Sequence, residues 1–336
     1  MKLKRIFILF FIVIIAAGAY SFYQLNRKAP IANEKLINIP KNTSVGKVVE
    51  IFNEQGLMEP AWFYRITVKI YSRASGEGIF AGSYMFDKGK TNFEILYSIF
   101  TGKQLCTVKV TFPEGIRLQK YASILLHKLA IDSAEFMQYV QSDSLLKANG
   151  IPGESTEGYF MPDTYEFYWK EPISEIVKRL LDAQDKIWQA KFQRYAEEEG
   201  RTRHEILTLA SIIEAETPVN DEKARIAGVY YNRLKYGMPL QSDPTVQYAL
   251  GNHKDRILYR DLDIDSPYNT YKHLGLPPGP INSPGIKSIE AAVFPENNDY
   301  LYFVAMGDGS GRHSFARTAA QHSYNVRVYR KNLKGR

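Results

Sequence analysis

Cysteine is almost absent from this chain, whose 336 residues include only Cys106. A single cysteine excludes an intrachain disulfide and a cysteine metal cluster, and we expect it to be a buried filler. The chain has no phosphate-binding loop and no dinucleotide-binding fingerprint. No pattern in the sequence requires a Ser-His-Asp catalytic triad. We therefore expect neither a metal nor another cofactor.

Histidine is also scarce, and its spacing does not match the HExxH pattern of a zinc peptidase. A zinc peptidase is therefore a distant alternative, and we expect His313 and His322 to be surface groups or to support a site from behind. The six histidines are His127, His204, His253, His273, His313 and His322.

Acidic residues are outnumbered, with 36 Asp and Glu against 43 Lys and Arg, which gives a formal net charge of +7. This balance suits an anionic partner such as nucleic acid, phospholipid or an acidic polymer, without selecting one of them. Hydrophobic residues make up 45% and charged residues 24% of the chain. These proportions indicate a packed globular protein and exclude a disordered chain or a collagen-like fibre.

The N-terminus carries a long apolar run, because residues 6–23 hold no charge. At about 1.5 Å per residue this run is about 27 Å long, close to the hydrocarbon thickness of a bilayer. Lys2, Lys4 and Arg5 precede it, so the N-terminus is expected in the cytoplasm and the rest outside. A cleaved signal peptide is the alternative, because residues 17–19 (AGA) resemble a cleavage site. Either reading argues against nucleic acid and favours lipid or cell wall as a partner.

A small mixed unit follows residues 24–36, which are polar and are expected to form a short stalk. Helix caps and hydrophobic periodicity predict its elements. They are helices after Thr43 or Ser44, after Pro60 and over 91–101, and strands over 79–86 and 107–112. This unit has no catalytic constellation, so we expect it to bind or position something.

From residue 113 to about 200 the chain is mainly helical, with one interruption over residues 157–169 (EGYFMPDTYEFYW). This segment combines aromatics, a proline and acids. One interpretation is a core strand with a turn at Pro162 and Asp163. The other is a substrate groove, in which sugar rings rest on aromatic faces while Glu157 and Asp163 bind hydroxyls. Composition alone favours neither.

Two acids, Glu214 and Glu216, lie near the end of a helix that begins at a Thr202–Glu205 capping box and stops before Pro218. At about 100° per residue, the two acids lie on opposite edges of the apolar stripe and cannot serve one site as a pair. An acid at the edge of such a stripe is partly desolvated, which raises its pKa and suits a general acid. The alternative is two solvated helix glutamates.

Long constrained segments follow, and such segments inside a globular domain are usually functional. Residues 237–249 form a loop rich in hydrogen-bonding groups, and residues 266–285 carry five prolines and three glycines. A strand pair is predicted over 300–304 and 313–315, followed by a basic helix from Thr318 with a solvated face.

Five motifs resemble the endolytic murein transglycosylase (YceG-like) family. They are EGYFMPDTYEF, LASIIEAET, GVYYNRLKYGMPLQSDPTVQYALG, SPYNTYKHLGLPPGPINSPG and YLYFVAMGDGSGRHSF. The resemblance covers nearly the whole chain. It implies an α+β fold with an anchor and transmembrane helix over 1–27, a LysM-like peptidoglycan-binding module over 28–108 and a catalytic domain over 109–336.

The resemblance also implies an activity, the cleavage of the MurNAc-β-1,4-GlcNAc bond within glycan strands without water, to leave 1,6-anhydro-MurNAc ends. It assigns the general acid and base to Glu214, with Glu216 supporting the site. The residues expected to contact substrate are Glu157, Tyr159, Asp163, Thr164, Tyr165, Glu216, Asn232, Gln241, Ser242, Asp243, Thr245, Tyr268, Asn269 and Thr270. Because the substrate's own C6 hydroxyl attacks, one carboxyl suffices, whereas ordinary glycosidases need two.

Two other functions stay open at this point, a non-catalytic scaffold that binds peptidoglycan and a hydrolase in which Asp243 supplies a second carboxylate. The resemblance further implies an inner-membrane, single-pass protein whose body lies outside the cytoplasm. It suggests peptidoglycan synthases as partners and the termination of nascent glycan elongation as a role.

Overall fold

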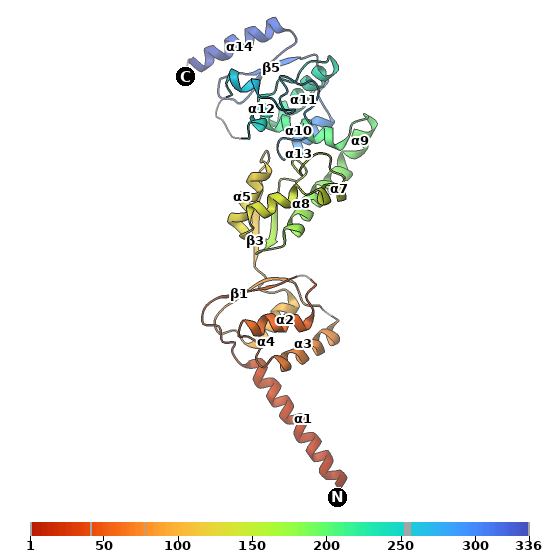
Figure 1. Cartoon of the computed structure of the whole chain (residues 1–336), viewed down its shortest axis with the longest axis vertical. Helices are drawn as coiled ribbons and strands as arrows, with labels where there is room; N and C mark the ends of the chain where they lie inside the picture. Colours follow the sequence, from red (N-terminus) through yellow and green to blue (C-terminus); the bar gives the residue numbers. More distant parts are fainter. Residues whose placement is uncertain (1, 41, 77, 252–256, 335–336) are drawn as a thin grey trace. The chain divides into compact units, whose positions relative to one another are not determined.

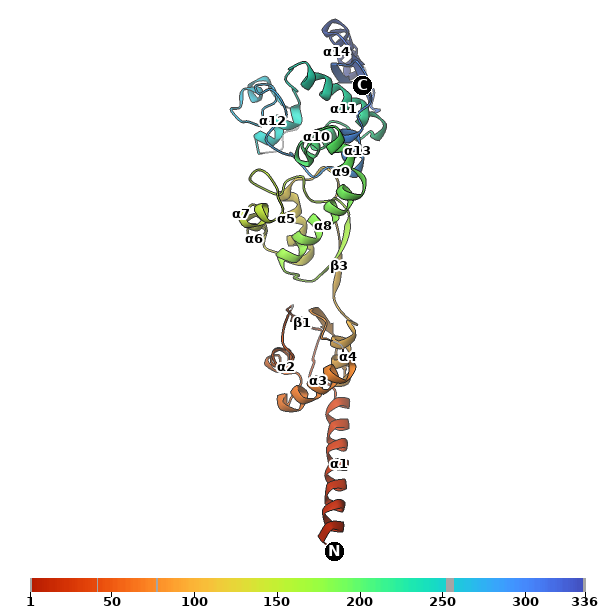
Figure 2. The same ribbon diagram turned by 90° about the vertical axis from the view of Figure 1, so that its right-hand side faces the viewer.

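A computed structural model describes residues 2–40, 42–76, 78–251 and 257–334, and it divides into two compact units. The N-terminal unit comprises Met1–Val108 and Glu166–Glu171, and the C-terminal unit comprises Lys109–Tyr165 and Pro172–Arg336. Both units combine helices with short strands (Figures 1 and 2). The predicted α+β class is therefore confirmed, while the assignment of a LysM-like module and a catalytic domain stays a prediction.

The N-terminal unit packs its helices and one strand pair around a single core. Strands β1 and β2 are antiparallel, with Ile37 opposite Tyr84. Phe52, Tyr64 and Ile99 belong to the core. The elements are α1 (Lys2–Asn26), β1 (Lys35–Ile39), α2 (Val45–Glu54), α3 (Ala61–Ser75), β2 (Gly82–Phe86) and α4 (Asn92–Thr101).

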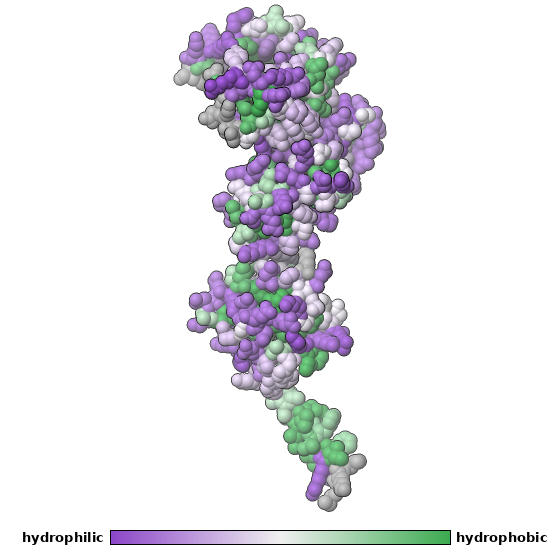
Figure 3. Space-filling model, viewed as in Figure 1, coloured by the Kyte–Doolittle hydropathy of each residue, from purple (hydrophilic) through white to green (hydrophobic). Residues whose placement is uncertain are grey.

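Helix α1 is long and apolar enough to cross a membrane by length and composition. Its segment Lys4–Asn26 reaches a mean hydropathy of 2.4 over its most apolar 18 residues, and none of that stretch is buried. Figure 3 shows the face of α1 in view as mainly hydrophobic, with a hydrophilic side chain near its N-terminal end. The helix therefore fits a single-pass membrane anchor.

Residues 24–36 do not form the expected stalk. Gln24 is buried, and its carbonyl oxygen accepts hydrogen bonds from the Tyr64 hydroxyl at 2.8 Å and the Asn92 amide at 3.1 Å. Ala29 and Ile31 belong to the core of the unit. The polar composition of this segment suggested a linker, but its few apolar side chains and its backbone carbonyls are used in packing.

The C-terminal unit is mainly helical. Its helices are α5 (Leu118–Leu129), α6 (Ser133–Val140), α7 (Asp143–Ala148), α8 (Ile173–Lys191), α9 (Gln193–Glu198), α10 (Arg203–Glu216), α11 (Asn220–Lys235), α12 (Asp243–Ala249), η1 (Tyr259–Asp263), α13 (Ile286–Val293) and α14 (Ala319–Lys334). Strands β5 (Tyr302–Ala305) and β6 (His313–Ala316) pair antiparallel. Strands β3 (Thr107–Thr111) and β4 (Thr164–Tyr168) pair with each other, and each has residues in both units.

Helix α10 is the centre of the C-terminal unit. The Thr202 hydroxyl accepts a hydrogen bond from the Glu205 amide, and the Glu205 carboxylate bonds back to Thr202, which confirms the predicted capping box. Residues 206–213 are all buried, on every face of the helix. A helix that is apolar all round belongs inside a protein, and α10 packs against α11, α12 and α13.

Several local predictions differ from the structure. Residues 243–249 form α12 rather than a loop, with Pro244 in the first turn, where its missing N–H costs nothing. Strand β1 was not expected, and β2 begins at Gly82 instead of residue 79. Cys106 is half-buried rather than buried, and burial raises the pKa of its thiol.

Candidate active site

Helix α10 ends with two glutamates whose carboxylates contact different parts of the C-terminal unit. Glu214 and Glu216 are two residues apart, so about 200° of helix rotation separates them. Among the described residues they share no hydrogen-bond partner. The predicted divergence of the two acids is therefore confirmed, and the surroundings of each decide which one faces a cavity.

Glu214 ties the end of α10 to α11 and α13. Its Oε2 accepts hydrogen bonds from the Ser288 hydroxyl at 2.6 Å, the Gly285 amide at 3.1 Å and the Lys223 ammonium at 3.1 Å. The side chains of Glu214 and Lys223 are 10% and 2% exposed. Glu214 and Lys223 therefore form a buried ion pair, which suits a role in holding the helices together.

Among the residues that the structure describes, the hydrogen bonds to Glu216 all reach one oxygen. Its Oε1 accepts hydrogen bonds from the Ser242 hydroxyl at 2.6 Å and the Tyr230 hydroxyl at 2.7 Å. Tyr230 belongs to α11, and Ser242 precedes α12. Two donors on Oε1 suit a carboxylic acid that carries its proton on Oε2, because the carbonyl oxygen then acts as the acceptor.

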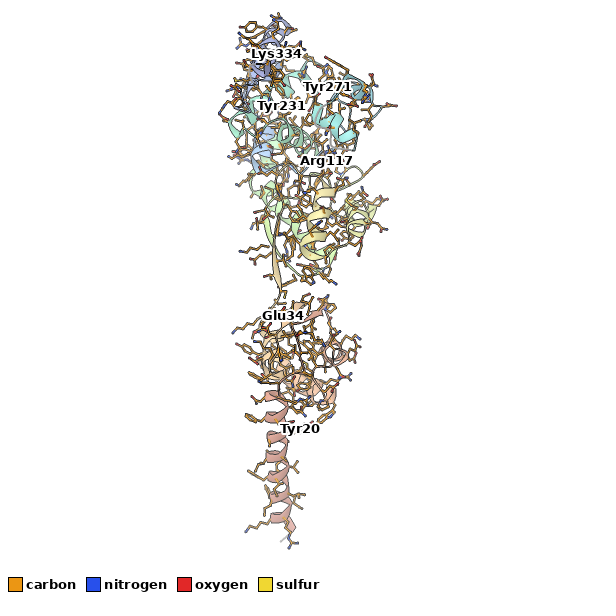
Figure 4. All side chains as sticks on the ribbon, turned by 90° about the vertical axis from the view of Figure 1, so that its left-hand side faces the viewer. Tyr20, Glu34, Arg117, Tyr231, Tyr271 and Lys334 are labelled. Atoms are coloured by element: carbon orange, nitrogen blue, oxygen red, sulfur yellow. The ribbon has the colours of Figure 1, made fainter. Side chains whose placement is uncertain are left out.

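Glu216 and Asp243 line one cavity of about 520 Å³. The Tyr271 hydroxyl, which also lines it, donates to Asp243 Oδ1 at 2.6 Å; Figure 4 labels Tyr271 in the C-terminal unit. The other lining residues are Tyr230, Arg233, Leu240, Gln241, Tyr302, Phe303, Val304, Ala305, His313, His322, Val326 and Tyr329. The cavity therefore brings two carboxyl groups and several aromatic faces together.

Burial raises the pKa of Glu216 above the ordinary carboxyl range. Hydrogen bonds from Ser242 and Tyr230 act in the opposite direction, and the neighbouring Asp243 adds to the increase. Burial also raises the pKa of Tyr230 and of Tyr271, which keeps both hydroxyls as donors. A carboxyl whose pKa is raised inside a cavity is suited to donate a proton to a substrate.

His313 and His322 line this cavity, and whether they support the site or contact substrate stays a prediction. His313 Nδ1 lies 2.9 Å from Glu222 Oε2, and the His313 amide donates to Glu222 Oε1 at 3.2 Å. Glu222 is buried. The His322 ring stacks on Tyr302, and burial lowers its pKa. Both histidines come from segments distant in sequence from α10, which is why their spacing carried no signal.

A second cavity of about 480 Å³ lies in the same unit. Glu157 lines it, with Oε2 accepting from the Leu118 amide at 3.3 Å, and burial raises the pKa of Glu157 to about 8. Tyr248 and Tyr268 also line it, with ring centroids 4.7 Å apart. The remaining lining residues are Gln141, Pro152, Gly153, Glu154, Ser155, His204, Pro267, Pro278, Gly279 and Pro280.

The other upstream residues expected in the groove line neither cavity. The Tyr159 hydroxyl lies 2.9 Å from His204 Nδ1, and Tyr159 is buried. Asp163 and Thr164 are exposed at the start of β4, and the Tyr165 hydroxyl donates to the Met161 carbonyl at 2.7 Å. Phe160 and Phe167 are buried on either side, as the core-strand interpretation predicts, and contact of the four residues with substrate stays a prediction.

Asn232 and Asn269 of the downstream motifs line neither cavity. The Asn232 amide donates to the carbonyls of Asn298 and Tyr300, and the Asn269 amide donates to those of Leu262 and Ile264. These bonds join α11 to residues 298–300, and the YNTY segment to the end of η1.

Two buried threonine hydroxyls hold Ser242, which donates a hydrogen bond to Glu216. Thr245 and Thr270 are both buried, and their hydroxyls lie 2.8 Å apart. The Ser242 amide donates to the Thr270 hydroxyl at 3.0 Å, and the Gln241 amide donates to the Thr270 carbonyl at 3.0 Å. These bonds hold Ser242 where it donates to Glu216.

The described part of the chain contains no group of three or more His, Cys, Asp or Glu residues able to hold a metal ion. His253 lies outside the described residues.

The profile of the YceG-like family matches residues 37–328. The chain belongs to the YceG-like family. It is 34% identical over 301 residues to a protein from Bacillus subtilis named endolytic murein transglycosylase, covering 85% of this chain and 82% of that one. A protein of the same name from Streptococcus pneumoniae is 29% identical over 354 aligned positions, covering 95% of this chain and 63% of the relative. The crystal structure of a YceG-like protein from Listeria monocytogenes matches with a TM-score of 0.61 at 31% identity, covering 88% of this chain and 99% of that one.

The resemblance to this family, drawn from five motifs, is therefore confirmed. Two residues that bind the acids of the cavity in this YceG-like chain were not predicted as site residues from the sequence. Tyr230 lies among the buried residues of α11 and was not predicted as a site residue, yet its hydroxyl donates to Glu216. Tyr271 ends the YNTY motif, and its bond to Asp243 spans 28 residues. The only signal in the sequence for Tyr230 was its hydroxyl, because a tyrosine hydroxyl that is buried needs a hydrogen-bond partner.

Proposed function

We propose that this chain is a lytic transglycosylase that cleaves peptidoglycan strands internally, with Glu216 as its general acid and base. Family membership and two relatives named endolytic murein transglycosylase support the reaction class. One observation supports Glu216, namely that it is the α10 acid that lines the cavity, where burial raises its pKa. Glu214, the acid that the sequence favoured, is engaged by Lys223, Gly285 and Ser288.

In the proposed reaction, Glu216 donates its proton to the glycosidic oxygen as the bond from that oxygen to the anomeric carbon of MurNAc breaks. The C6 hydroxyl of the same MurNAc then bonds to the anomeric carbon. Its proton passes to the Glu216 carboxylate, which restores the acid. No water is consumed, so one carboxyl acts twice, first as acid and then as base. Tyr230 and Ser242 stabilise the carboxylate formed midway by donating to Oε1.

The alternative of a hydrolase has one observation in its favour, because Asp243 lines the same cavity as Glu216 and could supply a second carboxylate. A muramidase-type hydrolase uses two carboxyl groups and adds water to the anomeric carbon. In the transglycosylase, Asp243 instead holds the Tyr271 hydroxyl at the cavity wall. The two reactions leave different ends on the glycan.

Mass spectrometry of peptidoglycan digested by the full chain distinguishes these reactions. We expect MurNAc ends lighter by one water than the products of a hydrolase, because the C6 hydroxyl replaces water as the nucleophile. Hydrated reducing ends would move the assignment to a Glu216 and Asp243 pair. Binding without any product, at every pH tested, would support the non-catalytic scaffold.

The second cavity is proposed to hold sugar residues of the same strand. Helix α12 joins the two sites, with Asp243 at its start on the first cavity and Tyr248 near its end on the second. Five residues at about 1.5 Å each separate them by roughly 8 Å along the axis, on the order of one or two sugar rings. Tyr268 offers an aromatic face there, and Glu157, held neutral by its raised pKa, can bond hydroxyls.

Tyr268→Ala is expected to weaken binding of an N-acetylglucosamine oligomer about tenfold, the effect of one lost aromatic contact. The measurement is calorimetric titration in a Glu216→Gln background, which prevents turnover. Tyr236→Ala is the matched control, since Tyr236 is exposed and lines neither cavity. Unchanged affinity of Tyr268→Ala would show that the strand does not reach this cavity.

Three further parts of the proposal concern the cell. Lys2, Lys4 and Arg5 before the apolar run support an N-terminus in the cytoplasm and a body outside it. An inner-membrane location would bring the cavity near newly made glycan. We propose peptidoglycan synthases as partners and the termination of glycan elongation as the role.

A further inference from the structure

Helix α3 carries a stripe of exposed apolar side chains in addition to its buried face. Trp62, Ile66 and Ile70 are 58%, 52% and 62% exposed, and their four-residue spacing puts them along one side of the helix. Phe63 and Tyr64, on the other side, are buried in the core of the N-terminal unit. Single exposed apolar residues are common, but a contiguous stripe of this kind marks an interaction surface.

The stripe continues directly from the membrane helix. The Tyr20 ring of α1 stacks on Trp62 with ring centroids 6.1 Å apart and an interplanar angle of 4°. Tyr20 also meets Phe63 edge-on at 5.6 Å. Tyr20 lies within the uncharged run of residues 6–23, about 5 Å from its end at about 1.5 Å per residue. If α1 spans the bilayer, Trp62 therefore lies at the depth of the interfacial aromatic belt.

The junction between α1 and the unit is fixed by hydrogen bonds. The Gln24 carbonyl accepts from both Tyr64 and Asn92, and Lys28 forms a β-bridge with Thr91. Figures 1 and 2 show α3 running across the end of α1, along the plane that a membrane around α1 would take. Figure 4 labels Tyr20 at this junction. The unit cannot swing away from the bilayer without breaking these contacts.

Basic side chains share the exposed face of α3 with the stripe. Arg65, Lys69 and Arg73 are exposed; at about 100° per residue, Arg65 and Lys69 lie on the Trp62 edge of the stripe, and Arg73 lies between Trp62 and Ile66. Arg65 also pairs with Glu50 of α2 at 2.6 Å. Apolar side chains with long cations beside them on one exposed face suit a helix in a membrane interface, because Lys and Arg stems reach from the apolar boundary to anionic headgroups.

We propose that α3 is an interfacial helix that docks the N-terminal unit on the outer face of the membrane. Trp62, Ile66 and Ile70 enter the boundary between headgroups and acyl chains, and Lys69 and Arg73 bind anionic headgroups. The proposal rests on the span by α1 and is independent of the chemistry at Glu216. Docking through α3 would hold the N-terminal unit at a fixed distance from the bilayer, whereas a flexible linker would let it move.

The test uses the full chain with Trp62 as its only tryptophan, made by Trp169→Phe and Trp188→Phe. The chain is reconstituted in vesicles of phosphatidylglycerol and phosphatidylethanolamine, part of them brominated near the carbonyl end of the acyl chain. We expect Trp62 emission to fall by about half or more, because an interfacial indole contacts bromine at that depth. A chain that keeps only Trp188, which is buried in α8, is the matched control and should lose little emission.

Three results would overturn the proposal. Trp62 emission that is unaffected by bromine yet quenched by aqueous acrylamide would mean that the stripe faces water. Protection from both quenchers would mean that a protein surface, such as a second copy of the chain, covers it. Recovery of the chain in the lipid-free fraction would remove the span by α1 as well, which separates that failure from the first two.

Discussion

Glu216→Gln is expected to abolish glycan cleavage, with a fall in rate of about a thousandfold or more. General acid catalysis contributes 10²–10⁴-fold, and here one carboxyl serves as both acid and base. The glutamine carbonyl can still accept hydrogen bonds from Tyr230 and Ser242, so the fold should persist. The measurement is the rate of release of anhydro-MurNAc ends, together with the thermal unfolding midpoint of the variant.

The pH dependence of the wild-type rate provides a second readout of the same carboxyl. A general acid must be protonated, so the rate falls as pH rises through its pKa. Because burial raises the pKa of Glu216, this fall should come above the ordinary carboxyl value of 4.5. An alkaline limb centred at or below that value would contradict Glu216 as the acid.

Glu214→Gln is the matched comparison for catalysis, since it changes the neighbouring acid of the same helix. Loss of cleavage in a folded Glu214→Gln variant, with cleavage retained in Glu216→Gln, would restore the assignment that the sequence favoured. If both variants kept full cleavage activity, neither acid would be catalytic.

Glu214→Gln should instead lower the free energy of unfolding by about 3 kcal/mol, because it leaves the buried Lys223 ammonium without its countercharge. The Ser288 hydroxyl and the Gly285 amide can still donate to the glutamine carbonyl, so the loss comes chiefly from the ion pair. Urea unfolding of the full chain in detergent, followed by circular dichroism, measures it.

The double variant Glu214→Gln, Lys223→Met is the control for this second effect. Replacing both partners of a buried pair is often close to neutral, so the double variant should recover most of the lost stability. A single variant as stable as wild type would mean that Lys223 finds another partner or water. The structural role of Glu214 would then be wrong.

Local signals in the sequence were sufficient for most helices. The capping boxes at Thr91 and Thr202 are formed by side chains three residues apart, so they can be recognised without tertiary information. Strand β1 could not be found in this way, because its five residues depend on pairing with β2, with Ile37 opposite Tyr84. The stalk was mistaken for the same reason, since Gln24 is held by Tyr64 and Asn92.

The sequence by itself determined the family, the apolar N-terminal helix and the divergence of Glu214 from Glu216. Each follows from motif order, composition or the fixed rotation of a helix, all of which are local properties. Only the tertiary structure decided which acid faces the cavity. That choice depends on Ser288, 74 residues from Glu214, and on Ser242, 26 residues from Glu216. Such contacts depend on how α11, α12 and α13 pack around α10, which no spacing within α10 can specify.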